Sequence, residues 1–359
     1  MRVSYVHMLQ YLGVVEHGLS IYPPISPACY DVATAQRSLD FGNELLAIAD
    51  ECGYDWVSLI EHHYSPRQLT PNPLLAAANM AARLRTAKIA ILGSTIPFLN
   101  PVRLAEEYAM LDLLSGGRAV VGLLRGTPPE YTTYWVNPAE SRGRYEEAVA
   151  LVLRAWTEPQ PFGWEGQYYR YRTVSIWPRP VQQPHPQVFV SGNSAESGSM
   201  AARLRLSLAL SFQPVPRARQ SIAHYQEEAA KAGWTPTGDN VVIRGFVHVA
   251  ETDAEAQKMA DDYDFCVTDG GRGMRANVLE AVTGYSGSRQ MHDRDELRQD
   301  GVAFIGSPAT VFEQMARWHE EVGANTLDAM FVGGRLPYER AKHSLELFGR
   351  EVLPKVHAL

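Results

Sequence analysis

Short apolar runs alternate with amphipathic stretches over almost the whole chain. A run of this kind between turn residues is typical of a buried strand, whereas apolar residues spaced by three or four indicate a helix. Eight runs each precede a helical stretch, at residues 3–8, 56–60, 88–92, 119–124, 187–190, 206–210, 241–249 and 327–332. We therefore predict an α/β protein with the (β/α)8 fold of the TIM barrel. An open doubly wound sheet competes with it, but residues 8–22 lack the expected GxGxxG fingerprint.

Residues 1–359 are predicted to form a single barrel domain with insertions. Residues 9–32 are proline-rich and too long for an ordinary connection between a strand and a helix. Residues 158–186 contain six prolines, and a β-hairpin is predicted within them at residues 164–174. Residues 268–299 are rich in Gly, Arg and Asp and show little periodicity, so they form a candidate lid.

Composition excludes several classes of protein. The net charge is -7 and the 33 Lys and Arg residues are scattered, which argues against a nucleic-acid surface. Cys29, Cys52 and Cys266 are far apart and form no CxxC pair, so neither a disulfide framework nor a zinc knuckle is expected. No apolar run approaches the ~18 residues of a membrane span, and the first residues lack the apolar core of a signal peptide. The expected location is the cytoplasm.

Three consecutive ionisable residues, Glu61, His62 and His63, end the predicted strand at 56–60. Barrel enzymes build their sites at the C-terminal ends of the strands, so a catalytic role is favoured over a structural one. Glu and His can also bind zinc, but neighbouring residues of an extended chain point to opposite sides, and no HxH or HExxH pattern is present. We predict acid–base chemistry with no metal, and the pattern alone assigns no separate roles to the three residues.

Candidate anion-binding residues follow the fourth and fifth predicted strands. Arg125 follows the strand at 119–124 and precedes a glycine, a context that suits a phosphate, although a salt bridge at the rim would also explain it. Asn193, Ser194 and Ser197 open the helix after the fifth strand, where backbone N–H groups and hydroxyls attract anions. Ordinary N-capping is the alternative for these three residues. Together the two positions suggest a phosphorylated ligand across the barrel mouth.

The chain resembles the bacterial luciferase-like flavin-dependent monooxygenase family over most of its length. The resemblance is densest from Asp55 to Gly126. Its features are Glu61-His62-His63-Tyr64, Asn72-Pro73, Gly93-Ser94, Asn100-Pro101, Ser115-Gly116-Gly117-Arg118, Arg125-Gly126 and, near the end, Phe348-Gly349-Arg350. The combination is specific for the superfamily, although each piece alone is not.

The resemblance implies an enzyme that uses reduced FMN and O2 to oxygenate a small organic substrate through a C4a-peroxyflavin. A separate reductase supplies the flavin in such systems, and a homodimer packed through the helices at 74–84 and 103–114 is expected. His62 inherits the role of catalytic histidine and proton carrier, with Glu61 as its modulator and His63 as a structural residue. Arg125, Asn193, Ser194 and Ser197 inherit contacts to the flavin phosphate. A cis peptide bond beside the flavin ring would fall at Leu92-Gly93. The luciferase α chain has Glu where Asn193 stands, and Leu124 replaces its reactive cysteine.

Three alternatives remain open beside this function. A deazaflavin-dependent hydride-transfer enzyme of the same superfamily would use the same phosphate-binding residues. A non-catalytic flavin-binding subunit would not need His62 or Arg125, so their presence argues against it. The third alternative is a metal-dependent barrel hydrolase. The substrate itself is not specified by the sequence.

Overall fold

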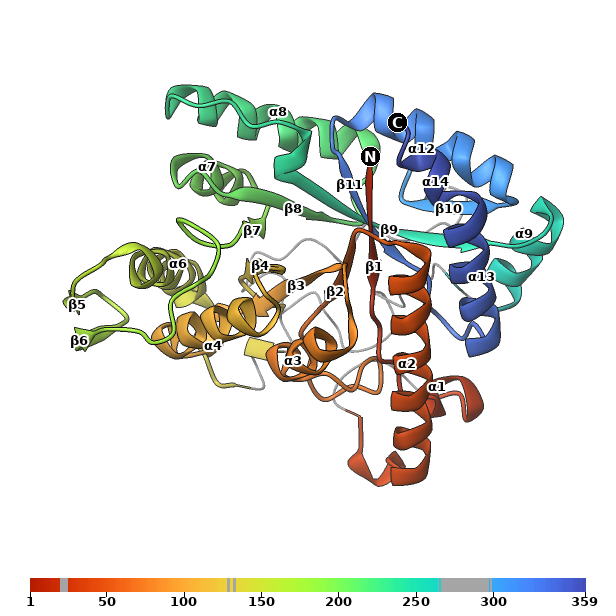
Figure 1. The fold of residues 1–359 in the computed structure, drawn as a ribbon, viewed down its shortest axis with the longest axis horizontal. Coiled ribbons are helices and arrows are strands. Elements are labelled where there is room, and N and C mark those ends of the chain that lie inside the picture. Colours follow the sequence, from red (N-terminus) through yellow and green to blue (C-terminus); the bar gives the residue numbers. More distant parts are fainter. Residues whose placement is uncertain (20–24, 128–129, 132–133, 264, 266–296, 298) are drawn as a thin grey trace.

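Eight parallel strands close into a barrel in the computed structural model, which describes residues 1–19, 25–127, 130–131, 134–263, 265, 297 and 299–359 (Figure 1). They are β1 (Arg2–Val6), β2 (Trp56–Leu59), β3 (Lys88–Thr95), β4 (Ala119–Leu124), β7 (Val188–Ser191), β8 (Ser207–Ser211), β9 (Val241–Val249) and β11 (Thr326–Met330). Pairing of β8 with β9 closes the barrel. Every strand overlaps one predicted apolar run, so the predicted fold is confirmed. A further buried strand, β10 (Ala303–Gly306), pairs with the second half of β9 and was not predicted.

Helices surround the barrel (Figure 1). They are α1 (Gly13–Glu16), α2 (Val32–Cys52), α3 (Pro73–Arg83), α4 (Pro101–Leu114), α6 (Ser141–Thr157), α7 (Ala195–Arg203), α8 (Val215–Lys231), α9 (Asp253–Asp262), α12 (Pro308–Val322), α13 (Tyr338–Glu351) and α14 (Leu353–Val356). Asn72 and Asn100 cap α3 and α4, each followed by a proline at the first helical position. The apolar spacing of residues 38–52 predicts only the later part of α2. The helix starts six residues earlier, at Val32, because the Asp31 carboxylate accepts the Thr34 N–H and caps it there.

The predicted insertions differ in how far the structure describes them. Strands β5 (Phe162–Glu165) and β6 (Arg170–Val174) form the predicted hairpin outside the barrel. Glu147 of α6 anchors it by accepting hydrogen bonds from the Trp164 indole (3.0 Å) and from two backbone N–H groups. Of the candidate lid at 268–299, all but residues 297 and 299 lie outside the described residues.

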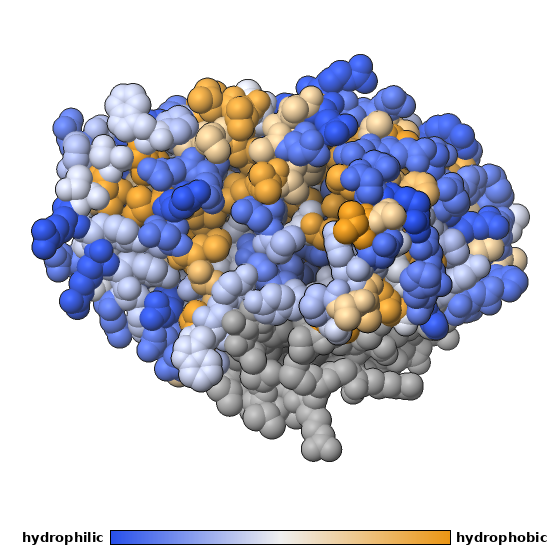
Figure 2. All heavy atoms as spheres, turned by 90° about the horizontal axis from the view of Figure 1, so that it is seen from below, coloured by the Kyte–Doolittle hydropathy of each residue, from blue (hydrophilic) through white to orange (hydrophobic). Residues whose placement is uncertain are grey.

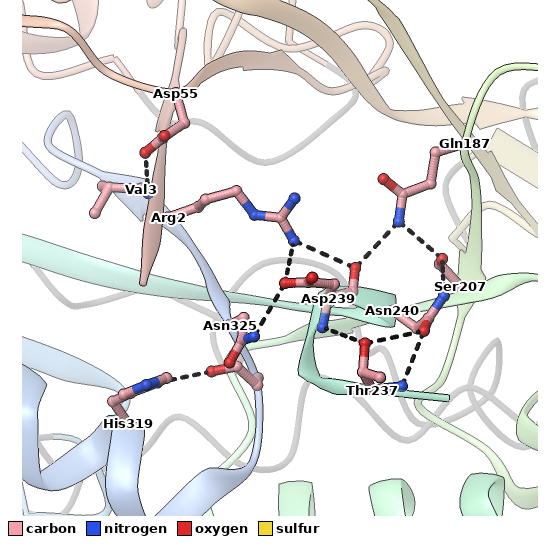
Figure 3. A network of polar contacts seen from close by, with 11 residues as sticks. Arg2, Val3, Asp55, Gln187, Ser207, Thr237, Asp239, Asn240, His319 and Asn325 are labelled. Carbon is pink, nitrogen blue, oxygen red and sulfur yellow. Dashed lines mark hydrogen bonds and ion pairs between the residues drawn. The ribbon is translucent and has the colours of Figure 1, made fainter. Parts of the chain in front are cut away.

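A polar network closes the end of the barrel at which the strands begin (Figure 3). Asp239 is its centre: Oδ1 accepts hydrogen bonds from Arg2 (2.9 Å) and Asn325 (3.0 Å), and its carbonyl accepts one from Gln187 (3.1 Å). The Arg2 guanidinium also lies over the ring of Trp56, 5.3 Å from its centre. These contacts connect the starts of β1, β2, β7, β9 and β11 and leave the opposite end for a site.

Candidate active site

The predicted site residues meet at the C-terminal rim of the barrel. Glu61, His62 and His63 directly follow β2, Arg125 follows β4, and Ser194 follows β7. Strands β2, β3, β4 and β7 are neighbours in the barrel, so the segments after them lie side by side. The rim position was predicted from the order of strands, but the partners of these side chains were not.

His62 is paired with a carboxylate that sequence reasoning missed. Its Nδ1 lies 3.2 Å from Oε1 of Glu130, whose side chain is only 3% exposed, against 28% for His62. The other oxygen of Glu130 accepts hydrogen bonds from the backbone N–H (2.9 Å) and the hydroxyl of Thr127. Glu130 lies in the connection between β4 and α6, five residues after Arg125, and that rim position was the one available signal.

The electrostatics of this pair define which nitrogen of His62 can react. Burial disfavours the charged form of Glu130, but the interaction with His62 and the Thr127 donors outweigh it and lower the pKa of this carboxyl. An ionised carboxylate only accepts hydrogen bonds, so we assign the proton of the neutral His62 ring to Nδ1. Nε2 then has a free lone pair at the partly exposed mouth, where it can exchange a proton.

Glu61 was predicted to modulate His62, and in the structure its carboxylate contacts His63 and Thr95. Oε1 of Glu61 lies 3.1 Å from Nε2 of His63, and its Oε2 accepts the Thr95 N–H at 3.1 Å. Residues two apart on an extended chain point to the same side, which brings Glu61 to His63 and turns His62 away from both. Beyond this pair, the Tyr134 hydroxyl lies 2.9 Å from Nδ1 of His63.

The start of α7 is surrounded by positive charge. Ser194 caps this helix and its hydroxyl contacts that of Ser197 at 3.1 Å. The pKa of Glu196, in the first turn, is lowered by its own backbone N–H, by the Ser194 hydroxyl, by Arg142 and, to a smaller extent, by Arg125. The half-buried Arg125 side chain therefore lies near enough to this helix N-terminus for its charge to act there.

Asn193 differs from the two serines. Its side-chain oxygen accepts hydrogen bonds from the Ser211 N–H (3.3 Å) and from Gln213 (2.9 Å), so it connects the ends of β7 and β8. A contact from Asn193 to a ligand would therefore use its amide nitrogen.

The Leu92–Gly93 peptide bond is cis, as the resemblance implies. It lies at an irregularity in the pairing of β3 with β4, and a Cβ on Gly93 would stand 2.5 Å from the Gly122 carbonyl oxygen, so only glycine fits. Inside the barrel, Arg244 of β9 donates a hydrogen bond to the Leu92 carbonyl (3.0 Å) and binds Asp328 through two nitrogens (2.6 and 2.8 Å). Arg244 was not predicted as a site residue, because it lies within the apolar run at 241–249.

The described residues contain neither a candidate metal site nor a candidate membrane span. In this part of the chain no three His, Cys, Asp or Glu side chains are grouped so that they could hold a metal ion. No described helix is long and apolar enough to span a membrane.

The sequence profile of luciferase-like monooxygenases matches residues 25–326. The chain belongs to this family. The family expected from the sequence is thus confirmed, and with it an enzyme of the flavin-dependent monooxygenase type.

The FMNH2-dependent dimethylsulfone monooxygenase of Pseudomonas putida is 24% identical over 89% of both chains. The oxygenase component of the flavin-dependent trigonelline monooxygenase of Acinetobacter baylyi is 22% identical over 90% of this chain and 91% of that one. An uncharacterised protein of Sinorhizobium fredii, y4wF, is 34% identical, but that match spans 44% of this chain and 47% of the relative.

Solved structures agree on the fold. Monooxygenase RslO1 from Streptomyces bottropensis superposes with a TM-score of 0.80 at 26% identity, over the whole of both chains. An F420-dependent secondary alcohol dehydrogenase superposes with a TM-score of 0.73 at 16% identity, over 99% of this chain and 98% of that one. Enzymes that use different cofactors therefore share this barrel.

Proposed function

We propose that this chain is the oxygenase component of a two-component system, which takes reduced FMN from a separate reductase and uses O2 to oxygenate a small organic substrate. The observation that carries the proposal is the His62–Glu130 pair, which stands on the same rim as the cluster of Arg125, Ser194 and Ser197. The names of the dimethylsulfone and trigonelline enzymes support reduced flavin and a separate oxygenase component. When bound, reduced flavin would supply the electrons that activate O2.

The residues present fit a flavin mononucleotide. Arg125 lies by a helix N-terminus that offers two hydroxyls, which suits a phosphate. Asn193 would add its amide nitrogen. Leu92 and Gly93, whose cis peptide bond stands at the irregularity between β3 and β4, would line the flavin ring.

His62 would hold or move a proton at Nε2, and Glu130 would orient the ring and stabilise its protonated form. A non-catalytic flavin-binding subunit has no use for a half-buried imidazole paired with a buried carboxylate. The first test is product formation by the purified chain supplied with reduced FMN, O2 and candidate substrates. Absence of flavin binding would contradict the proposal.

Arg125→Ala should weaken FMN binding about 10- to 100-fold, since a charge-assisted hydrogen bond contributes ~1.5–3 kcal/mol. The affinity for riboflavin, which lacks the phosphate, should change little. Fluorescence titration with both flavins measures the difference. The control is Arg154→Ala, which removes an arginine from the last turn of α6 in the same β4–α6 unit. An equal loss for both flavins would show that Arg125 does not contact the phosphate.

Hydride transfer with a deazaflavin is the second candidate, favoured by the superposition with the F420-dependent alcohol dehydrogenase. The phosphate-binding residues cannot distinguish the two cofactors. Turnover of an alcohol or ketone with the deazaflavin under anaerobic conditions would establish this candidate and exclude the first.

We further propose a homodimer that buries the outer face of α3 and α4. Figure 2 shows hydrophobic residues gathered on the side where these two helices lie in Figure 1. Leu75 of α3 is 73% exposed, and Met110, Leu113 and Leu114 of α4 are about half exposed. Apolar side chains grouped in this way mark an interaction surface.

Leu113→Asp should convert the dimer into monomers, because a charge would be buried in the interface. Light scattering after size exclusion measures the change from the mass of two chains to that of one. Val32→Asp, which places the same charge on the exposed start of α2, is the control. A wild-type chain that is already monomeric at micromolar concentration would overturn the dimer.

A further inference from the structure

A second carboxylate–imidazole pair stands beside the His62–Glu130 pair and ends in a phenol. Glu61 contacts His63 at 3.1 Å, and the other nitrogen of His63 lies 2.9 Å from the hydroxyl of Tyr134. This series of three side chains runs from the interior to the surface. The side chains of Glu61 and His63 are at least nine-tenths buried, whereas Tyr134 is 43% exposed. The His62 chemistry does not use these three residues.

The hydrogen bonds that join Glu61, His63 and Tyr134 have a defined direction. Glu61 accepts from the backbone N–H of Thr95, which can only donate, and also from the Thr95 hydroxyl. His63 Nε2 therefore donates to the Glu61 carboxylate, and in the neutral ring Nδ1 has the lone pair. Tyr134 O–H donates to Nδ1, so the phenol oxygen keeps its own lone pairs for a group at the mouth.

The ring of Tyr134 is held firmly although its hydroxyl is accessible. Its face stacks on Phe98 at 5.6 Å, and its edge meets His63 at 5.0 Å. Burial, and then the neighbouring Tyr64, Glu61 and Glu130, raise the pKa of Tyr134, so this phenol carries its proton at neutral pH.

Two further aromatic side chains are exposed. Tyr64, which follows His63 in the sequence, is 58% exposed, and Trp135, which follows Tyr134, is 94% exposed. Their backbones have φ values of 56° and 53°, in the left-handed region that bulky residues adopt at a cost of ~1–2 kcal/mol each. Strain that keeps an apolar ring in water is a feature of ligand-contacting residues. Flat rings beside a hydrogen-bond acceptor favour a planar, hydroxyl-bearing ligand.

We propose that Tyr134, His63 and Glu61 form a proton relay that binds the hydroxyl of a phenolic substrate and removes its proton. The substrate O–H bond breaks and its proton passes to the Tyr134 oxygen, while the original Tyr134 proton passes to Nδ1 of His63. The substrate keeps the electron pair as a phenolate, and Glu61 stabilises the imidazolium. A phenolate is richer in electrons than the phenol, so its ring accepts an oxygen atom more readily. This inference rests on the proposed oxygenase function and names its substrate class.

The test uses 4-nitrophenol, whose ionised form absorbs visible light, added to the purified flavin-free protein. The wild-type chain should lower the ionisation midpoint of the bound probe by about 1 unit. Tyr134→Phe and His63→Gln should each abolish the shift while retaining FMN binding, which also reports that the barrel is folded. Tyr30→Phe, an exposed tyrosine outside the relay, should leave the shift unchanged.

Each outcome decides one question. A shift that survives in Tyr134→Phe, or a wild-type chain that does not shift the probe, overturns the relay. Binding of 4-nitroanisole, which lacks the proton, as tightly as 4-nitrophenol overturns recognition of the hydroxyl. Normal FMN binding together with a failed shift rejects only this inference, whereas loss of oxygenation with every flavin-loaded sample rejects the proposed function.

Discussion

His62→Ala should bind FMN as tightly as the wild-type chain but form product about 10²- to 10⁴-fold more slowly, the usual contribution of a positioned acid or base. Nδ1 is held by Glu130, so the accessible Nε2 is the only ring atom left for proton exchange with a ligand. Alanine removes both nitrogens without touching Arg125 or the start of α7. Single-turnover product formation with chemically reduced FMN separates this step from the supply of flavin.

Two further variants control this prediction. Glu130→Gln keeps a hydrogen-bond partner for His62 but removes the charge, so its rate should fall between those of wild type and His62→Ala. His357→Ala removes an exposed histidine at the end of α14 that contacts Asp55, and it should turn over normally. Wild-type rates in His62→Ala would show that the proton is carried elsewhere.

The strands could be predicted because a parallel strand buried on both faces has to be apolar throughout, and such runs are visible in a single sequence. Strand β10 was missed because it follows the aperiodic segment at 268–299 and adds a strand beyond the eight strand–helix units on which the prediction was based. The start of α2 was missed because the hydrogen bond between Asp31 and Thr34, rather than apolar periodicity, sets it.

The rim position of Glu61, His62, Arg125 and Ser194 followed from their places after successive strands. Their pairings did not follow, because they depend on which side chains cross from one connection to the next. Glu130 reaches His62 over 68 positions of sequence, and no local pattern encodes that contact. The pairing of Glu61 with His63 shows that adjacency in sequence was a poor guide to the partner.

Asp328→Ala should lower the free energy of unfolding by about 3–5 kcal/mol, the usual loss when one member of a buried ion pair is removed. Asp328 is 1% exposed and accepts two hydrogen bonds from Arg244 and one from Ser58 (2.6 Å), so alanine leaves a buried guanidinium without its counter-charge. Denaturant unfolding followed by circular dichroism measures the loss. Asp262→Ala, whose carboxylate forms an exposed ion pair with Lys258, is the control and should lose less.

The double variant Arg244→Met/Asp328→Leu separates stability from positioning. Replacing a buried ion pair by apolar residues of similar volume is often neutral or stabilising, so the double variant should regain most of the unfolding free energy lost by Asp328→Ala. It cannot regain the hydrogen bond from Arg244 to the Leu92 carbonyl, which fixes the backbone next to Gly93. If that bond positions the wall of the flavin site, the double variant should be stable and yet bind FMN more weakly. Wild-type FMN affinity in the stable double variant would assign Arg244 to the barrel interior alone.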